Sequence, residues 1–415
     1  MTTHAPALPV FDGLSMRLSP RDPAFYANPY PAYAEIHARG PAVFWEDYGH
    51  WCFAGYDAVN ALLRDRRFGR QILHVASREE LGWPEPQPHV ADFDRLEANS
   101  LLELEPPAHT RLRTLVNRAF VSRQVERLRP EIEALAHGLV DGFVADGKVE
   151  LISRYGETIP VTVIARMLGV PVEMSRQLLD WSHRLVRMYM FGRTTETEHD
   201  ANAAAREFSA YLSGVIAEKR ENISDDLISH MLTARSGEDR LSEDELISTI
   251  VLLLNAGHEA TVHQIGNAVT TILSTGADAA AMFSTPETTE RAVEELMRYD
   301  PPLHMFTRWA LEDCEPVPGV KLKKGDKIGL MLGAAGHDPS KFPEPHLLKP
   351  DRDEGTHLAF GAGLHFCIGA PLARLELQVS LPVLFSRLPG LRLASQPTFR
   401  DAYHFRGVER LDLAW

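Results

Sequence analysis

The sequence predicts a mainly α-helical protein with a small β region. Residues 131–236 carry a helical pattern that is broken only at isolated glycines and prolines. A capping box at Ser242–Glu245 then begins a helix that runs to about Ser274. At 1.5 Å per residue this helix is roughly 50 Å long and must cross the whole domain. Short aromatic and β-branched segments at 42–45 and 50–54 predict a β-hairpin.

The composition is that of an ordinary globular protein. The 415 residues are 44% hydrophobic and 24% charged, and the net charge of −14 argues against nucleic-acid and anionic-membrane partners. Three scattered cysteines are too few for a disulfide framework, which favours a reducing compartment. There is no signal-peptide pattern, and no apolar run approaches the roughly 18–20 residues of a membrane span. We expect a cytoplasmic, single-domain protein over residues 1–415, with an extended N-terminal arm at about residues 1–20.

One segment near the C-terminus carries the strongest chemical signal. Residues 360–369 read F-G-A-G-L-H-F-C-I-G and lead directly into a helical pattern at 370–387. The glycines allow the backbone to approach a flat ligand closely. Cys367 then lies at a helix N-terminus, where free N–H groups and the helix dipole stabilise a thiolate. A thiolate in an apolar pocket is an axial ligand of haem iron, whereas a lone cysteine is also a common small core residue.

The pattern F-G-x-G-x-H-x-C-x-G resembles the haem-binding loop of the cytochromes P450. The resemblance implies the mainly helical P450 fold, haem b as the cofactor and Cys367 as the axial ligand of its iron. It also implies that Phe360 packs beside the thiolate and that His365 donates to a haem propionate. Gly361 and Gly369 are the expected cofactor-binding glycines of this loop.

A second segment suits the propionates of the same cofactor. His109 and Arg113 are four residues apart, on one face of a helix that begins after Pro107. Two donors on one face suit a pair of carboxylates, although such groups often only solvate a helix. The segment is similar to the E-P-P-x-H-T-R-x-R helix of the P450 family, which implies propionate binding. The resemblance also assigns Arg308, in the strand pattern 303–308, to a propionate.

Basic residues are concentrated between positions 108 and 130, where the only acidic residue is Glu126. On an acidic protein such a patch attracts an acidic partner or solvates a helix face. The sequence contains no flavin or iron–sulfur domain. We therefore expect NAD(P)H to supply electrons indirectly, through a separate ferredoxin or flavodoxin and its reductase. The basic residues are Arg111, Arg113, Arg118, Arg123, Arg127 and Arg129.

The middle of the long helix contains unusual residues for a helix interior. Gly257 costs helix stability, so a neighbour is expected to pack closely there. Glu259, in an otherwise apolar helix, is expected to be paired or functional unless it reaches solvent at a helix crossing. The segment resembles the P450 oxygen-binding motif A-G-x-[DE]-T, but Ala260 occupies the threonine position. Thr261 follows, about one-third of a turn away. The resemblance implies that Glu259, Ala260 and Thr261 form the catalytic segment, with protons supplied by ordered water, Glu259 or a substrate hydroxyl.

The pair Glu295 and Arg298 is an E-x-x-R motif followed by two prolines. Alone, such a pair is a weak surface ion pair. Its place before the haem loop resembles the P450 pattern, which implies a buried network with Arg352. Losing one member of such a network would leave an unpaired buried charge.

The resemblance also places a substrate pocket and implies an activity. We expect Met190, Leu253, Ala256, Leu303 and Met305 on the pocket wall. The expected activity is haem-thiolate monooxygenation, in which one oxygen atom of O₂ is inserted into an apolar small molecule. Alternatives are a peroxide-driven reaction, a coupling or dehydrogenation, and a haem sensor without turnover.

Three segments complete the expected pocket and β region. Residues 188–191 are predicted to form a mobile lid, although such a cluster is also typical of plain core. The irregular stretch 69–100 either covers the pocket or is a surface loop. A loop at 399–406 is expected to reach back to the pocket. A hairpin is expected at 320–327 and a closing strand at 411–415.

Overall fold

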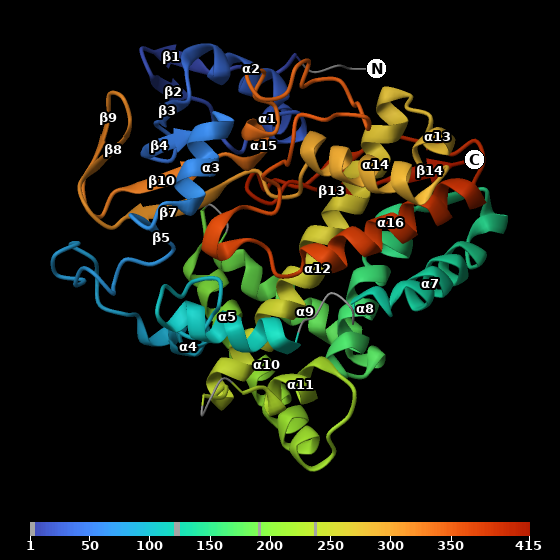
Figure 1. Ribbon diagram of the computed structural model, residues 1–415, viewed down its shortest axis with the longest axis horizontal. Coiled ribbons are helices and arrows are strands. Elements are labelled where there is room, and N and C mark those ends of the chain that lie inside the picture. Colours follow the sequence, from blue (N-terminus) through green and yellow to red (C-terminus); the bar gives the residue numbers. More distant parts are fainter. Residues whose placement is uncertain (1–4, 120–124, 190–191, 236–238) are drawn as a thin grey trace.

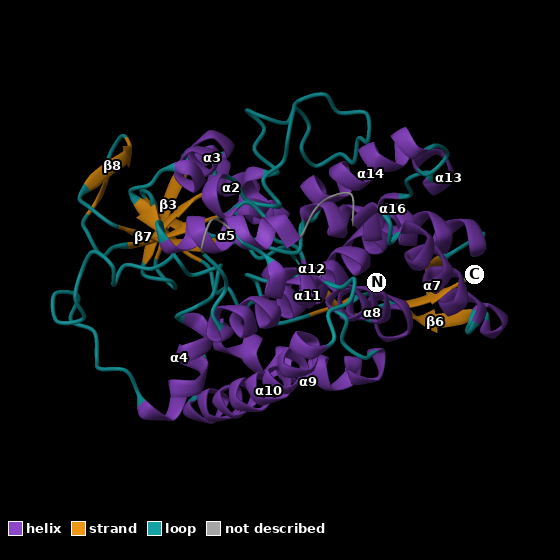
Figure 2. Ribbon diagram, turned by 60° about the horizontal axis from the view of Figure 1, so that its bottom comes forward, coloured by secondary structure: helices purple, strands orange, loops and turns teal. Residues whose placement is uncertain are grey.

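The computed structural model describes residues 5–119, 125–189, 192–235 and 239–415. Helices make up most of the molecule, and the largest sheet lies at one side of it (Figure 1, Figure 2). The predicted mainly helical fold with a small β region is therefore confirmed.

The largest sheet contains strands from both the N-terminal and the C-terminal halves of the chain. Its strand order is β1-β2-β3-β4-β10-β7-β5. The predicted hairpin is confirmed as β3 and β4, which pair antiparallel with Ala42 opposite Phe53. Strand β10 pairs parallel with β4 and antiparallel with β7, so the C-terminal half of the chain completes the N-terminal sheet. The strands are β1 (Val10–Asp12), β2 (Ser15–Arg17), β3 (Ala42–Trp45), β4 (His50–Phe53), β5 (Phe68–Gly69), β7 (Phe306–Ala310) and β10 (Lys327–Leu330).

Small sheets lie elsewhere in the chain. The predicted closing strand is confirmed as β14, which pairs with both β11 and β6. Strand β12 pairs with β13, and β8 pairs with β9. These strands are β6 (Lys148–Glu150), β8 (Cys314–Val317), β9 (Val320–Leu322), β11 (Arg392–Leu393), β12 (Thr398–Phe399), β13 (Val408–Arg410) and β14 (Asp412–Ala414).

The structure corrects three sequence predictions. Residues 10–17, within the expected N-terminal arm, form the β1–β2 hairpin, and β2 pairs with β3. The hairpin expected at 320–327 is wrong. Strand β9 instead pairs with β8, through a turn at Gly319, whose φ is +85°. Lys327 begins a different strand, β10, whose partners are distant in the sequence. The region 131–236 is not helical throughout, since it contains β6. In each case the missed element is a short strand. Its partner is either distant in the sequence or lies across a turn that the sequence analysis did not recognise.

Helices surround the cavity described below. The irregular stretch expected at 69–100 ends in a short 3₁₀ turn, η1, and α4. The helices are α1 (Pro23–Ala27), α2 (Tyr30–Arg39), α3 (Tyr56–Arg64), η1 (Pro88–Val90), α4 (Ala91–Glu97), α5 (Ala108–Ala119), α7 (Arg129–Asp141), α8 (Thr158–Leu168), α9 (Ser175–Val186), α10 (Thr195–Glu221), α11 (Leu227–Thr233), α12 (Glu243–Thr275), α13 (Ala279–Met282), α14 (Pro286–Tyr299), α15 (Leu332–Ala335) and α16 (Ala370–Arg387).

Helix α12 crosses the middle of the molecule, as its predicted length requires (Figure 1). The capping box is present, with Ser242 and Glu245 each accepting from the other's backbone N–H. The helix packs against α8, α9, α14 and α16. A Cβ at Gly257 would lie 3.2 Å from Cγ1 of Ile164 on α8, so the expected close neighbour of this glycine is present.

Glu295 and Arg298 form a buried network with Arg352. Arg298 Nε lies 2.7 Å from Glu295 Oε2, and Arg352 Nε lies 3.0 Å from Glu295 Oε1. The backbone N–H of Lys349 also donates to Oε1, at 2.8 Å. The carboxylate of α14 therefore fixes the loop that precedes the segment 360–369.

Replacing this carboxylate is expected to destabilise the protein strongly. Glu295→Ala leaves two arginines without their buried partner, which typically costs about 3–5 kcal/mol of unfolding free energy. The matched control is Glu290→Ala, at an exposed position of the same helix, with an expected effect within about 0.5 kcal/mol. Denaturant unfolding followed by circular dichroism measures both variants. Equal midpoints for the two variants would contradict the structural role of Glu295.

Candidate active site

The segment 360–369 is a tight loop that ends at the start of α16. The N–H of Cys367 donates to the carbonyl of Phe360, at 3.0 Å. Gly361 and Gly363 have φ values of +68° and +71°, a region that favours glycine. A Cβ at Gly363 would lie 2.5 Å from the carbonyl oxygen of Leu63, so the loop approaches the end of α3 too closely for another residue.

The thiol of Cys367 has the environment of a metal ligand. Burial raises its pKa, while backbone amides of Gly369 and Ala370 and the charge of Arg113 act in the opposite direction. The helix start thus supplies the expected donors, but they do not outweigh burial. A bound cation is needed to hold this thiol fully deprotonated.

The ring of Phe360 lies under a cation at the edge of this loop. The guanidinium carbon of Arg374 is 4.5 Å from the ring centroid. Arg374 also pairs with Glu294 of α14, at 2.6 Å. The ring of Phe360 is therefore held in place at the start of the loop that carries Cys367.

A cavity of about 770 Å³ connects this loop with α12. Cys367 lines it together with Glu259, Ala260 and Thr261 of α12. The remaining predicted pocket residues that are described also lie on its wall, and Met190 lies outside the described residues. These wall residues are Leu253, Ala256, Leu303 and Met305.

Two other expected segments reach the same cavity. Phe93 and Leu96 of α4 line it, so the stretch 69–100 contributes to the pocket rather than forming only a surface loop. His404 and Phe405 also line it, which confirms that the loop at 399–406 reaches back to the pocket. Of the expected lid, Met188 is buried against the cavity.

One part of the cavity wall holds a buried guanidinium, that of Arg308. Arg308 is 4% exposed, and its guanidinium donates to the carbonyl of the neighbouring Thr307, at 2.9 Å. Burial, with the nearby charge of Arg70, lowers the pKa of Arg308 to about 9. Within the described residues, no carboxylate forms an ion pair with Arg308. A buried guanidinium in this state suits an anionic ligand.

The predicted histidines lie in the same region. The rings of His109 and His365 are 4.5 Å apart, and neither ring nitrogen of His109 has a hydrogen-bond partner. His365 Nε2 lies 3.6 Å from Glu105 Oε1. Arg113 donates to the carbonyl of Phe366, at 2.8 Å, and also borders the cavity. Unpaired donors around a half-buried thiol fit a flat cofactor that carries carboxylates, so the residues present fit haem.

Glu259 is buried and paired, which excludes the alternative that it reaches solvent. It is 4% exposed, and Arg400 Nη1 lies 2.6 Å from its Oε1. Burial alone would raise the pKa of this carboxyl. The hydrogen bond and charge of His263 and the charge of Arg400 nevertheless hold it well below its usual range. Glu259 is therefore a buried anion that is paired with Arg400.

A second acid lies near the cavity, on α16. Glu376 is fully buried, neither of its oxygens has a hydrogen bond of ordinary geometry, and the Thr261 hydroxyl is its polar neighbour. Burial raises the pKa of Glu376 to about 8, and Thr261 offsets this only in part. Glu376 is thus protonated at neutral pH and able to donate a proton.

Sequence reasoning missed Glu376, Arg70 and Arg400. Glu376 stands between Leu375 and Leu377 in an apolar helix, which is the signal that identified Glu259. The two arginines lie in irregular segments, where no periodicity indicates which residues face inward. Their roles depend on tertiary contacts.

A half-buried thiol at a helix start, the Arg308 guanidinium and an acid-bearing helix around one cavity fit a haem-thiolate site. Comparison with known proteins supports this class. The cytochrome P450 family model matches residues 277–389. The polyketide biosynthesis cytochrome P450 PksS of Bacillus subtilis is 33% identical, with 95% of this chain and 98% of that protein covered. The cytochrome P450 monooxygenase PikC of Streptomyces venezuelae is 36% identical, with 94% and 92% covered.

A solved structure gives the same result. P450BioI, in complex with an acyl carrier protein ligated to hexadec-9Z-enoic acid, superposes with a TM-score of 0.87 at 34% identity, covering 94% of this chain and 99% of that one. The chain belongs to the cytochrome P450 family. It is a bacterial-type monooxygenase of this haem-dependent family, which requires redox partners. None of the helices in the described residues has the length and apolar character that a bilayer crossing requires.

The raised pKa of Glu376 predicts a pH-dependent stability. In the unfolded chain a glutamate has a pKa of about 4.3. The contribution of the protonated folded form is therefore complete below that value and lost as the pH rises through about 8. Glu376→Gln keeps the shape and removes the titration. Between about pH 5 and pH 9, the thermal midpoint of the wild type is expected to fall relative to that of this variant.

Thermal unfolding of the two proteins across this pH range, followed by circular dichroism, measures the difference. Glu290→Gln, at an exposed site, is the control and is expected to follow the wild type. Parallel curves for the wild type and Glu376→Gln would show that the Glu376 carboxyl does not titrate in this window.

Proposed function

We propose that the chain is the single haem domain of a cytoplasmic monooxygenase that oxidises a largely apolar small molecule. Its electrons come from NAD(P)H through a separate ferredoxin or flavodoxin and its reductase. The observation that carries this proposal is the cavity shared by Cys367 and the Glu259 face of α12. Haem b, when bound, supplies the activation of O₂ from which one oxygen atom enters the substrate.

The residues of the loop and the cationic wall hold the cofactor. The Cys367 sulfur is the ligand for the iron. Arg308, His109 and His365 supply donors for the propionates, and Arg113 adds positive charge near the thiol. The position of the loop is set by Phe360, Gly361 and Gly369. Gly369 is the N-cap residue of α16, and a Cβ at this residue would lie 3.8 Å from the sulfur of Cys367.

Proton supply in this chain differs from the usual family pattern. Ala260 offers no hydroxyl to the cavity, and Thr261 is buried beside Glu376. Glu259 is ionised and held by Arg400, whereas Glu376 is protonated. We infer that ordered water relays protons past Ala260 from the protonated Glu376, or from a hydroxyl of the substrate.

The cavity wall suits a substrate with an apolar body and one polar end. Apolar side chains of α4, α9 and α12 line one part of the wall, among them Leu96, Leu185 and Val251. At another part of the wall lie His50, His404 and Lys327. Burial, followed by the charge of Lys327, lowers the pKa of His404 to about 4, so its ring is neutral, and its Nε2 has no partner. These groups suit a carboxylate or another acceptor.

The relatives support this substrate class. PksS is named for polyketide biosynthesis, and P450BioI was solved with a fatty acid on a carrier protein. Both names describe chemistry with long apolar chains or rings. A free acid and a carrier-bound acyl chain are therefore the two forms of substrate to compare.

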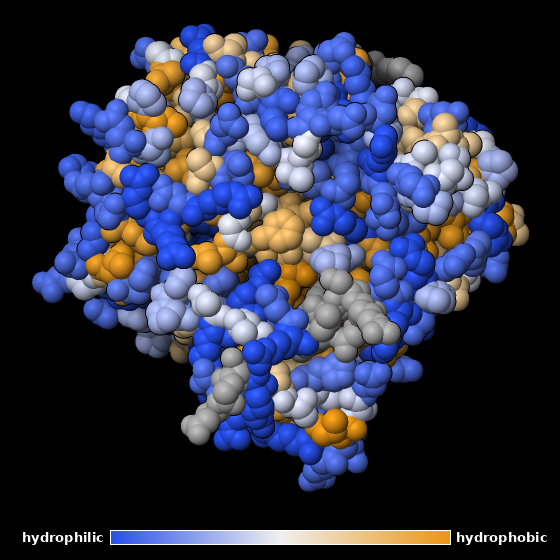
Figure 3. Space-filling model, viewed as in Figure 1, coloured by the Kyte–Doolittle hydropathy of each residue, from blue (hydrophilic) through white to orange (hydrophobic). Residues whose placement is uncertain are grey.

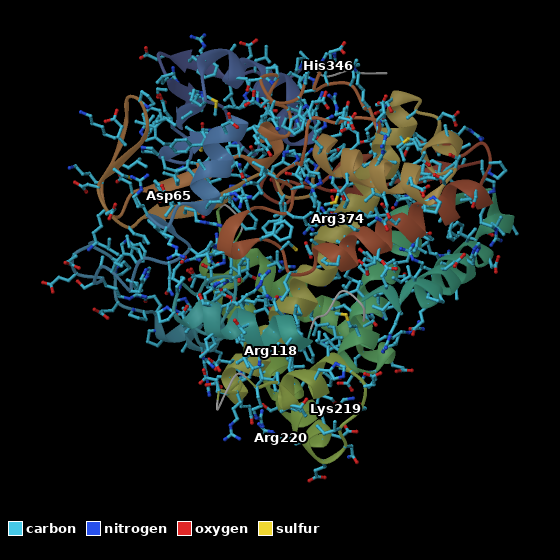
Figure 4. The ribbon with its side chains drawn as sticks, viewed as in Figure 1. Asp65, Arg118, Lys219, Arg220, His346 and Arg374 are labelled. Atoms are coloured by element: carbon cyan, nitrogen blue, oxygen red, sulfur yellow. The ribbon has the colours of Figure 1, made fainter. Side chains whose placement is uncertain are left out.

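The surface over the Cys367 loop suits an acidic electron carrier. Leu364 and Phe366 are exposed at 38% and 40%, and α5 borders this loop. The face seen in Figure 3 has apolar side chains near its centre and hydrophilic ones around them. Figure 4 labels Arg118 and Arg374 on the same view of the molecule.

The basic patch of the sequence is only partly free for such a partner. Arg111 pairs with Glu245, and Arg129 pairs with Glu126. Arg123 lies outside the described residues. Arg118 and Arg127 are exposed, so these two are the basic residues of the patch that remain for a partner.

The activity is tested by incorporation of ¹⁸O₂. A panel of fatty acids, their methyl esters, macrolactones and steroids is first screened for ligands that shift the haem absorption band. The best ligand is then incubated with NADPH, a ferredoxin, its reductase and ¹⁸O₂. One ¹⁸O atom per product molecule is expected, and acids are expected to bind more tightly than their esters.

Cys367→Ser is expected to abolish the activity, because it removes the sulfur ligand. Cys314→Ser, at a partly exposed cysteine of β8, is the matched control and is expected to retain it. Product with hydrogen peroxide but not with NADPH would indicate the peroxide-driven alternative. Haem binding without turnover of any ligand would indicate a sensor.

Ala260→Thr tests how protons are delivered. Because the native route already works without this hydroxyl, the ratio of product formed to NADPH consumed is expected to change less than about twofold. Ala260→Ser is the smaller companion variant. Product analysis alongside NADPH consumption measures the ratio. A several-fold gain in Ala260→Thr would show that the native relay is incomplete and that our inference is wrong.

A further inference from the structure

Imidazole and carboxylate groups gather between α9 and α12, at the edge of the cavity. His183 lies on α9, and His258 and Glu259 lie on α12. Glu259 Oε2 is 3.5 Å from Nε2 of His183 and 3.7 Å from Nε2 of His258. The three atoms lie within 4.8 Å of one another, and no other group of this kind occurs in the described residues.

Two of these atoms are buried and lack partners. His258 and Glu259 are 2% and 4% exposed. Neither Nε2 of His258 nor Oε2 of Glu259 has a hydrogen-bond partner. Leaving a buried polar atom unpaired typically costs about 1–3 kcal/mol. Two such atoms that point to one place indicate a site for a third group.

The other atoms of both side chains are already bonded. His258 Nδ1 lies 2.6 Å from the carbonyl oxygen of Leu254, which can only accept, so Nδ1 carries the proton. With its proton on Nδ1, the ring presents the lone pair of Nε2. Oε1 of Glu259 is bonded to Arg400, which leaves Oε2 free. This is the outer-shell arrangement that orients metal ligands in proteins.

We propose that His183, His258 and Glu259 bind one Zn²⁺ ion, which joins α9 to α12. Two imidazole nitrogens and one carboxylate oxygen are a ligand set that Zn²⁺ prefers, with a fourth position for water. At metal–ligand distances of about 2.0–2.2 Å, adjacent ligands of a tetrahedral ion lie about 3.4 Å apart. The two distances to Glu259 are close to this value.

The site is accessible, and its position gives it an effect on the cavity. The side chain of His183 is 43% exposed, so an ion reaches the site from solvent. Leu185 and Val186, later on α9, line the cavity. A metal that ties His183 to α12 therefore holds this wall in place. We expect it to stabilise the fold and to slow ligand exchange.

The test measures zinc bound to the haem-loaded full-length protein. After treatment with EDTA and buffer exchange, ZnCl₂ is titrated by isothermal calorimetry, and bound zinc is counted by mass spectrometry after gel filtration. We expect one ion per chain in the wild type, with affinity at least about tenfold weaker in His183→Ala. Zinc is also expected to raise the thermal midpoint of the wild type but not that of the variant.

The control is His346→Ala. His346 is an exposed histidine at the top edge of Figure 4, and in the same view Figure 1 shows α9 near the middle. This variant is expected to bind zinc like the wild type. His183→Gln repeats the test with a side chain of similar size. Equal zinc affinity in the wild type and both His183 variants, or no zinc bound by the wild type, would overturn the proposal.

Discussion

The carboxylate of Glu295 is the interaction on which the position of the haem loop depends. It binds Arg298 of the same helix and joins α14 to Arg352 and the backbone of Lys349, so the loop before residues 360–369 cannot move independently of the helix. The neighbouring Glu294 pairs with Arg374 of α16, at 2.6 Å. Two adjacent glutamates of one helix therefore hold the chain before and after Cys367. Because burying these charges is costly, the arrangement is stable only when every partner is present.

The charges of the cavity make cofactor and fold interdependent. Arg308, His109 and His365 are buried or nearly so, and burial lowers the pKa of each. Such groups favour the folded state only when an anion offsets their desolvation. With a cofactor that carries carboxylates bound beside them, these residues would gain stability from it. Glu295 differs from these residues, because the groups that balance its charge, Arg298 and Arg352, are part of the protein chain itself.

The sequence was most informative where a pattern is local. The long helix, the loop around Cys367 and the Glu295–Arg298 motif follow from spacing and resemblance, and the structure brings them together as expected. Strands such as β6 and β10 were missed because their pairing is with residues far along the chain. Arg400 was missed for the same reason, since only the folded chain brings it to Glu259. Local rules therefore predict the elements and the ligand loop, but not the charge partners.

The contact between Glu259 and Arg400 has a consequence for where a substrate is oxidised. Arg400 also bonds His263 at 3.0 Å, and Asn267 of α12 donates to the carbonyl of Arg406 at 3.3 Å. The chain between these two arginines carries His404 and Phe405 into the cavity. Glu259 is thus also an anchor of the cavity wall. Neutralising it would release Arg400 and with it this part of the wall, so the orientation of a bound molecule depends on a single side chain.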